Sequence, residues 1–212
     1  MASGGKYGSN VQVIGVTGGV GSGKSAVLAS LARMGCIVVK SDDLAHYAIL
    51  PGTPAYRRIV EHFGKGILTE KGTVDRGRLA DIVFRDRAEL AVLNRIVHPP
   101  VLEQLRRTFE EIASCGERAR VAVELPLLVE AGLVDLVDAV VLVTAPREER
   151  IRRMIGQGWP ESRVVAVMRA QAADAEKAKY ADAVIDNGGT LAELDEKVAR
   201  ALDEVAGGSC VG

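Results

Sequence analysis

Short β-branched runs alternate along this chain with longer stretches in which apolar residues recur three and four positions apart. The first pattern is typical of buried strands and the second of amphipathic helices. Five runs predict strands: Val11–Thr17, Cys36–Val39, Arg120–Glu124, Ala139–Val143 and Ala183–Asp186. Strands that alternate with helices predict an α/β fold with a parallel β-sheet flanked by helices, although the pattern leaves the order of the strands open.

The segment between the second and third predicted strands is helical. It holds helical patterns from Pro54 to about Phe63, from Arg76 to Phe84, and from Arg85 to about Cys115, the last interrupted at Pro99–Pro100. No convincing strand occurs between residues 52 and 118. We therefore expect a helical insertion between two strands of the core.

A second helical segment follows the fourth predicted strand. A basic helix is expected from Arg147 to about Gln157, and another from Glu161 to about Ala173. In the basic helix Arg150 and Arg153 are three residues apart and share a face, whereas Arg152 points elsewhere. Not all of these arginines can therefore serve one site.

The ends of the chain carry little apolar pattern. Residues 1–10 are small and polar and lack the apolar stretch of a signal peptide, so we expect a disordered leader. Residues 206–212 are Gly-rich and predict a flexible tail. Before this tail, Thr190 and Glu193 stand at the positions of a capping box, which predicts the start of the last helix.

Composition limits the possible partners. The 212 residues, 48% hydrophobic and with a formal net charge of −1, suffice for one α/β domain with insertions. This balance argues against non-specific nucleic-acid binding and against an anionic membrane surface, and no apolar run approaches the roughly 20 residues of a membrane helix. Three cysteines, Cys36, Cys115 and Cys210, are few and odd in number, so we expect a reduced, cytoplasmic protein. We favour a monomer.

A glycine-rich stretch joins the first predicted strand to the first predicted helix. From Gly18 to Ser25 it has the spacing G-x-x-x-x-G-K-S of a phosphate-binding loop. Glycines let backbone N–H groups face anionic oxygens, and the helix that begins at Gly23 adds the positive end of its dipole. Lys24 is expected to reach the β- and γ-phosphates, and the Ser25 hydroxyl to bind Mg²⁺. A chance Lys-Ser pair after a turn is the alternative, and the order strand, loop, helix argues against it.

Acids stand at the carboxyl ends of two other predicted strands, the edge at which ligands bind in open α/β sheets. Asp42 follows the second strand, and Glu124 ends the third. This position favours a functional role for Asp42, and an acid at the place of Glu124 can hold Mg²⁺ through water. Alternatively, Ser41 is a helix N-cap and the acids after it only compensate the helix dipole, while Glu124 is an ordinary strand-end acid.

The arginine-rich helices favour a phosphoryl-transfer enzyme. Phosphoryl transfer needs positive charge around the transferring group and exclusion of water, and a helical lid that carries arginines supplies both. A solvated basic face is the alternative. The chain lacks the Asn-Lys-x-Asp motif that reads guanine, and Leu125 rather than a second acid follows Glu124. A small-molecule kinase is therefore favoured over a GTPase switch or a motor-type ATPase.

The ordered set of motifs resembles the dephospho-coenzyme A kinase family. The pieces that carry the resemblance are Ser41–His46, Pro51–Ala55, Phe63–Gly64, Gly72–Arg76, His98–Pro99, Glu124–Glu130 and Ala181–Asn187, together with the more generic loop at residues 16–25. The resemblance extends from Val13 to about Ala201. It implies transfer of phosphate from ATP to the 3′-hydroxyl of dephospho-coenzyme A, with Mg²⁺ between the β- and γ-phosphates. The alternatives are another P-loop small-molecule or nucleotide kinase, and a nucleotide-binding module that has lost catalysis.

The resemblance also implies three parts: a P-loop nucleotide-binding core at residues 11–50, 119–146 and 181–205, a helical coenzyme-A-side domain at residues 51–118, and a lid at residues 147–180. It implies contacts with ATP for these residues: Gly19, Val20, Gly21, Ser22, Gly23, Lys24, Ser25, Ala26, Asn187 and Gly188. It implies metal binding by Ser25 and Glu124.

The resemblance further assigns roles in the reaction. Asp42 matches the acid that accepts the proton of the ribose hydroxyl, and Lys24 and the lid residue Arg153 match cations at the transferring phosphate. Substrate-side residues are Asp42, Arg76, His98 and Leu127. For His98 a structural role is equally compatible with its position, since a His-Pro pair in a helical domain can cap or kink a helix.

Two positions depart from the family pattern. Lys40 stands where many members have the first acid of Asp-x-Asp, so the metal or base role falls on Asp42 alone. Lys40 would then lower the pKa of Asp42 or bind a substrate phosphate. A lid arginine common in the family falls at Gln157, and Arg163 and Arg152 are the candidates to replace it.

Overall fold

The computed structural model describes residues 5–83 and 85–207. Two compact units make up this part of the chain: residues 40–108 form one, and the residues before and after them form the other. The second of these holds a five-stranded sheet with the strand order β2-β3-β1-β4-β5. Its strands are β1 (Val11–Thr17), β2 (Ile37–Lys40), β3 (Ala119–Glu124), β4 (Ala139–Thr144) and β5 (Ala183–Asp186).

The sheet follows the parallel pattern that the sequence predicts. β1 pairs in parallel with both β3 and β4, and β4 pairs in parallel with β5. All five predicted strands are confirmed to within one residue at each end. The central strand β1 is apolar except for Gln12 and Thr17, and Val13, Ile14 and Val16 are fully buried. Burial on both faces explains why β1 and β4 are largely continuous apolar runs, whereas buried and exposed positions alternate in the edge strand β5.

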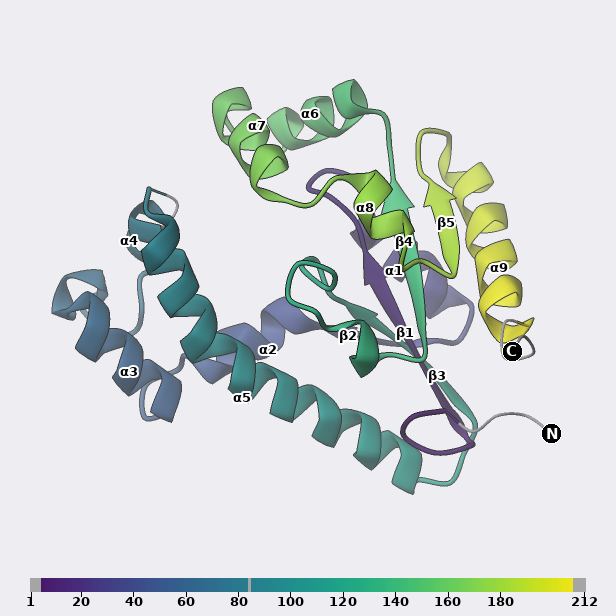
Figure 1. Cartoon of the computed structure of the whole chain (residues 1–212), viewed down its shortest axis with the longest axis horizontal. Coiled ribbons are helices and arrows are strands. Elements are labelled where there is room, and N and C mark those ends of the chain that lie inside the picture. Colours follow the sequence, from purple (N-terminus) through teal and green to yellow (C-terminus); the bar gives the residue numbers. More distant parts are fainter. Residues whose placement is uncertain (1–4, 84, 208–212) are drawn as a thin grey trace. The chain divides into compact units, whose positions relative to one another are not determined.

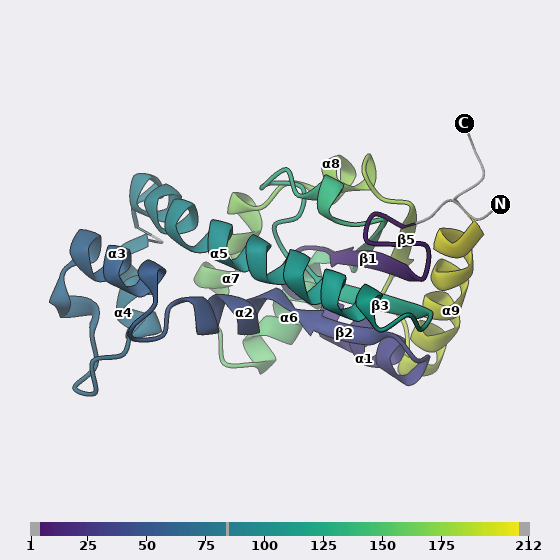
Figure 2. The same cartoon turned by 90° about the horizontal axis from the view of Figure 1, so that it is seen from below.

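Helices pack against this sheet (Figures 1 and 2). The sheet-containing unit holds α1 (Lys24–Arg33), α6 (Arg147–Gly156), α7 (Glu161–Ala170), α8 (Asp174–Ala178) and α9 (Leu191–Gly207). α1 and α9 pack against each other, and α9 runs alongside β5. Val27, Leu31, Val198 and Leu202 contribute to the shared core. Among the described helices, none combines the length and the apolar character that crossing a bilayer requires.

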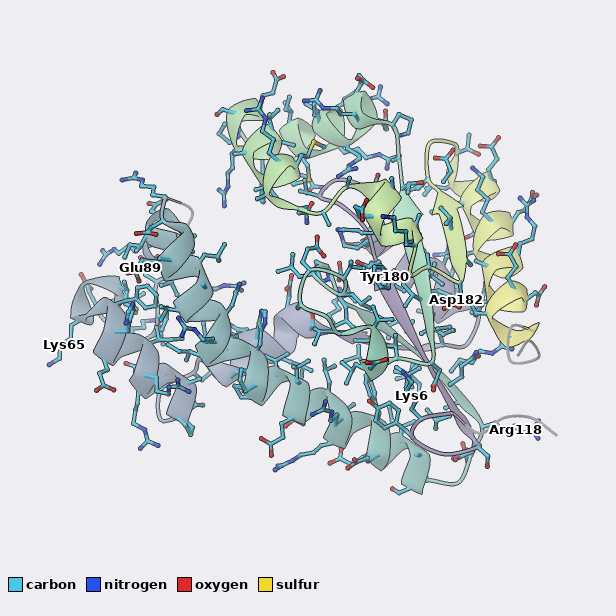
Figure 3. The ribbon with its side chains drawn as sticks, viewed as in Figure 1. Lys6, Lys65, Glu89, Arg118, Tyr180 and Asp182 are labelled. Atoms are coloured by element: carbon cyan, nitrogen blue, oxygen red, sulfur yellow. The ribbon has the colours of Figure 1, made fainter. Side chains whose placement is uncertain are left out.

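Two aspartates complete the sheet at the amino ends of its strands. Asp138 Oδ2 accepts a hydrogen bond from the backbone N–H of Val13 at 2.7 Å. Asp182, labelled in Figure 3, accepts one from the backbone N–H of Val140 at 2.8 Å. Each carboxylate thus satisfies a donor where a strand ladder begins. Asp182 belongs to the motif Ala181–Asn187, and this contact gives it a structural role.

The expected disorder of the leader is wrong for residues 5–10. The backbone N–H of Lys6 donates to Asp138 at 2.7 Å, and the Tyr7 hydroxyl donates to the Leu136 carbonyl at 2.9 Å (Figure 3 labels Lys6). The Tyr7 ring packs edge-on against fully buried Phe109, with 5.0 Å between ring centroids. A buried aromatic contact therefore fixes a segment that looks featureless in sequence. Residues 1–4 lie outside the described residues.

At the carboxyl end of the chain, the last helix extends further than the sequence predicts. α9 continues to Gly207, so two residues of the predicted tail at 206–212 are helical. Residues 208–212, with Cys210, lie outside the described residues. The other two cysteines, Cys36 and Cys115, are free thiols, and burial raises the pKa of Cys36.

The unit at residues 40–108 is helical, as the sequence predicts. It contains α2 (Ser41–Ala48), α3 (Pro54–Phe63), α4 (Arg76–Val83) and most of α5 (Arg87–Ser114), which continues into the other unit. Buried Ile59, Ile67 and Leu79 form its own core. Its boundaries differ from the expected 51 and 118, because Ile49 after α2 packs on this core while Phe109 packs on Tyr7. Phe84, the predicted end of the second helix, lies outside the described residues.

Two helix predictions need correction in this unit. α5 is not interrupted at Pro99–Pro100 but runs through both prolines. Proline removes a backbone donor, and burial of Ile96, Val101 and Leu105 around this point offsets that loss. Ser41 is not the N-cap of α2: Lys40, in extended conformation, takes that position and makes no capping hydrogen bond with its side chain.

The helical segment after β4 also differs in detail. The two expected helices exist as α6 and α7, but α7 ends at Ala170 rather than near Ala173. A further short helix, α8, was not predicted, because its five residues are too few for a helical period to be recognised.

The capping box of α9 generates a stability prediction. Thr190 Oγ1 accepts from the Glu193 N–H at 3.3 Å, and Glu193 Oε2 accepts from the Thr190 N–H at 2.7 Å. Thr190→Ala is expected to lower the free energy of unfolding by about 1 kcal/mol, measured by urea denaturation at pH 7.

The same contacts predict how this difference varies with pH. Hydrogen bonds from the Thr190 backbone and side chain lower the pKa of Glu193 below its ordinary 4.5. A lowered pKa stabilises the fold above pH 4.5, and this contribution is lost as the pH falls through the folded-state pKa. The difference in the free energy of unfolding between wild type and Thr190→Ala should therefore become smaller below pH 4.5. A difference that becomes larger there would contradict the capping box.

Candidate phosphate-binding site

The loop between β1 and α1 has the geometry of an anion-binding turn. Strand, loop and helix occur in the predicted order, and Gly23 is the N-cap of α1. Gly21 and Gly23 have φ angles of +73° and +90°, which favour glycine. A side chain at Gly23 would also overlap the amide of Asn187. Backbone conformation and close packing therefore both require glycine there.

The carbonyl of Ser22 in this loop accepts hydrogen bonds from two distant side chains. Asn187 Nδ2 donates to it at 2.9 Å and Arg153 Nη1 at 3.4 Å. Arg153 Nη2 donates in addition to the Asn187 carbonyl at 2.8 Å, and the Asn187 N–H donates to Thr144 at the end of β4 at 2.8 Å. Asn187 is almost fully buried. Residues that follow β4 and β5 thus hold the loop that follows β1.

Val20 near the loop tip is held through both of its backbone polar groups. Its N–H donates to Gln171 Oε1 at 2.9 Å, and its carbonyl accepts from Arg150 Nε at 2.9 Å. Arg150 Nη1 also lies 3.1 Å from Asp174 Oδ2. The Arg150 guanidinium lies against Gly19, where a side chain would overlap it. This contact gives Gly19 a packing requirement too.

The arrangement of the arginines agrees with their spacing. Arg150 and Arg153 of α6 face the loop, with side chains 11% and 26% exposed. Arg152 is 78% exposed and pairs with Glu149 on the surface of the same helix. Arg163 lies over the Trp159 ring, 4.3 Å from its centroid. Arg150 is therefore a second arginine that contacts the loop, besides Arg153.

The loop and the start of α1 offer several donors to an anion. Within the part of the chain that the structure describes, the N–H groups of Gly21, Gly23 and Ser25 donate to no protein acceptor. Lys24 Nζ donates to the carbonyls of Gly18 and Gly19 at 3.0 and 3.2 Å, which keeps the ammonium beside the loop. Backbone donors, a lysine and the positive end of a helix dipole suit a chain of phosphates.

The neighbouring groups suit a magnesium ion that is bound mainly by phosphate and water. Ser25 lies in the first turn of α1, and Glu124 ends β3 opposite Val16 of β1 in the strand register. No group of three or more His, Cys, Asp and Glu side chains among the described residues is arranged to hold a metal. Mg²⁺ commonly uses one or two protein ligands together with substrate phosphates, so this donor set fits it.

Gly188 and Leu127 lie near the same edge of the sheet. Gly188 follows the carboxyl end of β5, and its N–H donates to Asp186 at 3.0 Å. Leu127 lies in the turn after β3, is 38% exposed, and can contact a ligand. Its neighbour Leu128 is fully buried and packs over β1 at Gly15.

Three expected site residues belong to the helical unit at 40–108. Asp42 is exposed in the first turn of α2, two residues after β2 ends. Arg76 is the first residue of α4. His98 lies inside α5, and burial lowers its pKa below the ordinary 6.5. In the free protein the ring is therefore mostly neutral at pH 7 and can form hydrogen bonds through both nitrogens.

Several contacts around the loop do not follow from the sequence. Gln171 and Asp174 lie in the segment predicted to be a lid, residues 147–180, and belong to no phosphate-binding motif. Glu130 was noted only as the last residue of a motif. Of these residues, only Arg150 could be predicted from the sequence, because it shares a helix face with Arg153. The others become recognisable only when the fold brings their segments to the loop.

Comparison with known proteins gives a consistent result. The family model for dephospho-CoA kinase matches residues 12–193. A dephospho-CoA kinase from Thermobifida fusca is 44% identical over 193 residues, which cover 91% of this chain and 95% of that protein. A crystal structure from Thermus thermophilus matches with a TM-score of 0.76 and 35% identity, covering 96% of this chain and 100% of that one. A dephospho-CoA kinase from Campylobacter jejuni shares the fold, with a TM-score of 0.67 at 22% identity and coverage of 93% and 98%. The chain belongs to the dephospho-CoA kinase family.

Proposed function

We propose that this protein transfers the γ-phosphate of ATP to the 3′-hydroxyl of dephospho-coenzyme A, giving coenzyme A and ADP in the final step of coenzyme A biosynthesis. Membership of the family over residues 12–193 supports this activity. The observation that carries the proposal is the loop after β1, whose free N–H groups adjoin Lys24, Arg150 and Arg153.

The role of the loop is to hold the donor and stabilise charge on the transferring phosphate. Phosphoryl transfer requires little covalent chemistry from the protein, so fixed positive charge and position account for most of the catalysis. The loop N–H groups bind the phosphate chain, while Lys24 and Arg153 balance the charge on the transferring group. Ser25, and Glu124 through water, would hold Mg²⁺, which would supply positive charge to the phosphates.

Asp42 is the proposed general base. As the ribose 3′-oxygen attacks the γ-phosphorus, the hydroxyl proton passes to the Asp42 carboxylate, the new P–O bond forms, and the bond to the β-phosphate oxygen breaks to release ADP. Its exposure in the first turn of α2 leaves this carboxylate accessible to a substrate. Arg76, neutral His98 and Leu127 are proposed to contact the acceptor.

The two departures from the family pattern receive different interpretations. Lys40 is the exposed N-cap of α2, two residues before Asp42, and is proposed to bind a substrate phosphate. Arg150 is proposed to supply the positive charge that Gln157 lacks, because it contacts the loop directly. We further propose a cytoplasmic monomer, in which the free thiols of Cys36 and Cys115 remain reduced.

An acceptor panel tests the proposed function. ADP release from Mg²⁺-ATP should be strongly stimulated by dephospho-coenzyme A, with coenzyme A as the product, and not by adenosine, AMP or shikimate. Stimulation by another acceptor would reassign the substrate while leaving the loop chemistry in place. ATP binding without stimulation by any acceptor would indicate a nucleotide-binding module that has lost catalysis.

Arg153 provides a prediction with a neighbouring control. Arg153→Met removes donors at the loop and charge beside the transferring phosphate, so kcat/KM for ATP should fall by roughly 100-fold. Arg152→Met removes an exposed arginine from the same helix and should change kcat/KM less than about twofold. Both arginines pair with Glu149, so each of the two substitutions removes one ion pair with this residue. Equal effects of the two substitutions in steady-state kinetics would exclude a specific role for Arg153.

Asp42 is tested against the adjacent acid in the same helical turn. Asp42→Asn keeps the shape and removes the base, so kcat should fall by about 10²- to 10⁴-fold while the KM for ATP stays near that of the wild type. Asp43→Asn makes the same change one residue on and should preserve most of the turnover. Near-normal kcat in Asp42→Asn would refute the assignment.

A further inference from the structure

Lys177 in α8 is a buried lysine to which the proposed reaction assigns no role. Its side chain is fully buried, and its Nζ lies 3.0 Å from Glu130 Oε1. The orientation pairs the two charges without a well-directed hydrogen bond. A buried ammonium without a counter-charge is strongly unfavourable, so this lysine fixes the position of the Glu130 carboxylate. Glu130 lies in the turn after β3, at the end of the motif Glu124–Glu130.

The same carboxylate oxygen contacts the segment that joins α7 to α8. Glu130 Oε1 accepts a hydrogen bond from the Ala172 N–H at 3.0 Å. Backbone hydrogen bonds tie Gln171 to Val167 of α7, and the N–H groups of Glu176 and Lys177 in α8 donate to the Ala173 carbonyl. Between them, the Ala172 N–H is held by Glu130, which lies about 40 residues earlier in the chain, in the turn after β3.

This segment in turn holds the phosphate-binding loop. Gln171, next to Ala172, accepts from the Val20 N–H at 2.9 Å. Asp174 pairs with Arg150 at 3.1 Å, and Arg150 donates to the Val20 carbonyl at 2.9 Å. The contacts therefore form a continuous path from Lys177 and Glu130, through residues 171–174, to both backbone polar groups of Val20.

We propose that Glu130, paired with Lys177, is a positioning residue for the phosphate-binding loop, acting through Gln171. It touches neither the phosphate donor nor the acceptor; it fixes the segment that shapes the loop. The consequence for ATP affinity rests on the proposed function, whereas the effect on the loop can be measured in the free protein.

Amide hydrogen exchange of Val20 in the free protein is the first test. Glu130→Ala and Gln171→Ala should each speed exchange at Val20 by roughly fivefold or more, because its N–H loses an acceptor or the support of that acceptor. Glu176→Ala is the matched control, since Glu176 lies in the same helix as Lys177 and forms an exposed pair with Lys179, the residue that follows this helix. Its Val20 exchange should equal that of the wild type. Unchanged Val20 exchange in a folded Glu130→Ala protein would overturn the proposal.

ATP affinity and steady-state kinetics provide the second test. Each of the two substitutions should weaken ATP binding by roughly fivefold and leave the KM for dephospho-coenzyme A within about twofold. The double variant should bind ATP no more weakly than the weaker single variant, because Glu130 acts through Gln171. If the losses of ATP affinity in the two single variants multiply in the double variant, Glu130 does not act through Gln171. Altered Val20 exchange in a protein that phosphorylates no acceptor would contradict the proposed function and leave the positioning role intact.

A charge-neutral double variant tests the proposal even if Glu130→Ala does not fold. Glu130→Gln combined with Lys177→Met removes both charges, while the new amide oxygen can still accept from the Ala172 N–H. Val20 exchange and ATP affinity should then return to within about twofold of the wild type. Faster exchange in this variant, with a native melting temperature, would overturn the proposal.

Discussion

The shape of the phosphate-binding loop depends on hydrogen bonds that reach it from other parts of the chain. Loop residues 18–23 include four glycines, which contribute no side-chain packing and lose much conformational freedom on folding. The loop is held instead by its backbone: the Ser22 carbonyl by Asn187 and Arg153, and Val20 by Gln171 and Arg150. The glycines in turn make room for these side chains, so loop and surroundings require each other.

The strand order makes these contacts possible. β1 lies beside β4, and β4 lies beside β5, all in parallel, so the three strands end at one edge of the sheet. The loop follows β1, α6 with its arginines follows β4, and Asn187 follows β5. A single sheet edge therefore gathers residues more than 160 positions apart. The aspartates at the opposite ends of the strands complete the ladders and fix the register on which this convergence depends.

Sequence reasoning recovered what local patterns specify. The strands, the loop and the shared helix face of Arg150 and Arg153 follow from β-branched runs, glycine spacing and helical geometry. Predictions from the sequence were wrong where a contact between distant residues determines the local structure. Tyr7 is ordered because it packs on Phe109, and α5 continues through two prolines because the apolar residues around them are buried. Gln171 was missed for the same reason, since nothing local marks the end of α7 as a partner of the loop.

The two loop arginines combine fixed position with remaining binding capacity. A guanidinium has five N–H donors. Arg153 uses three of them, on Glu149, Ser22 and Asn187, and Arg150 uses two, on Val20 and Asp174. Five minus three leaves two donors on Arg153, and five minus two leaves three on Arg150. Their acidic partners hold both charges beside the loop before any phosphate binds, so little reorganisation is needed when it does. Arg150 and Arg153 therefore lie against the loop as part of its surroundings, and a lid that moves as a rigid segment would have to break bonds to the loop itself.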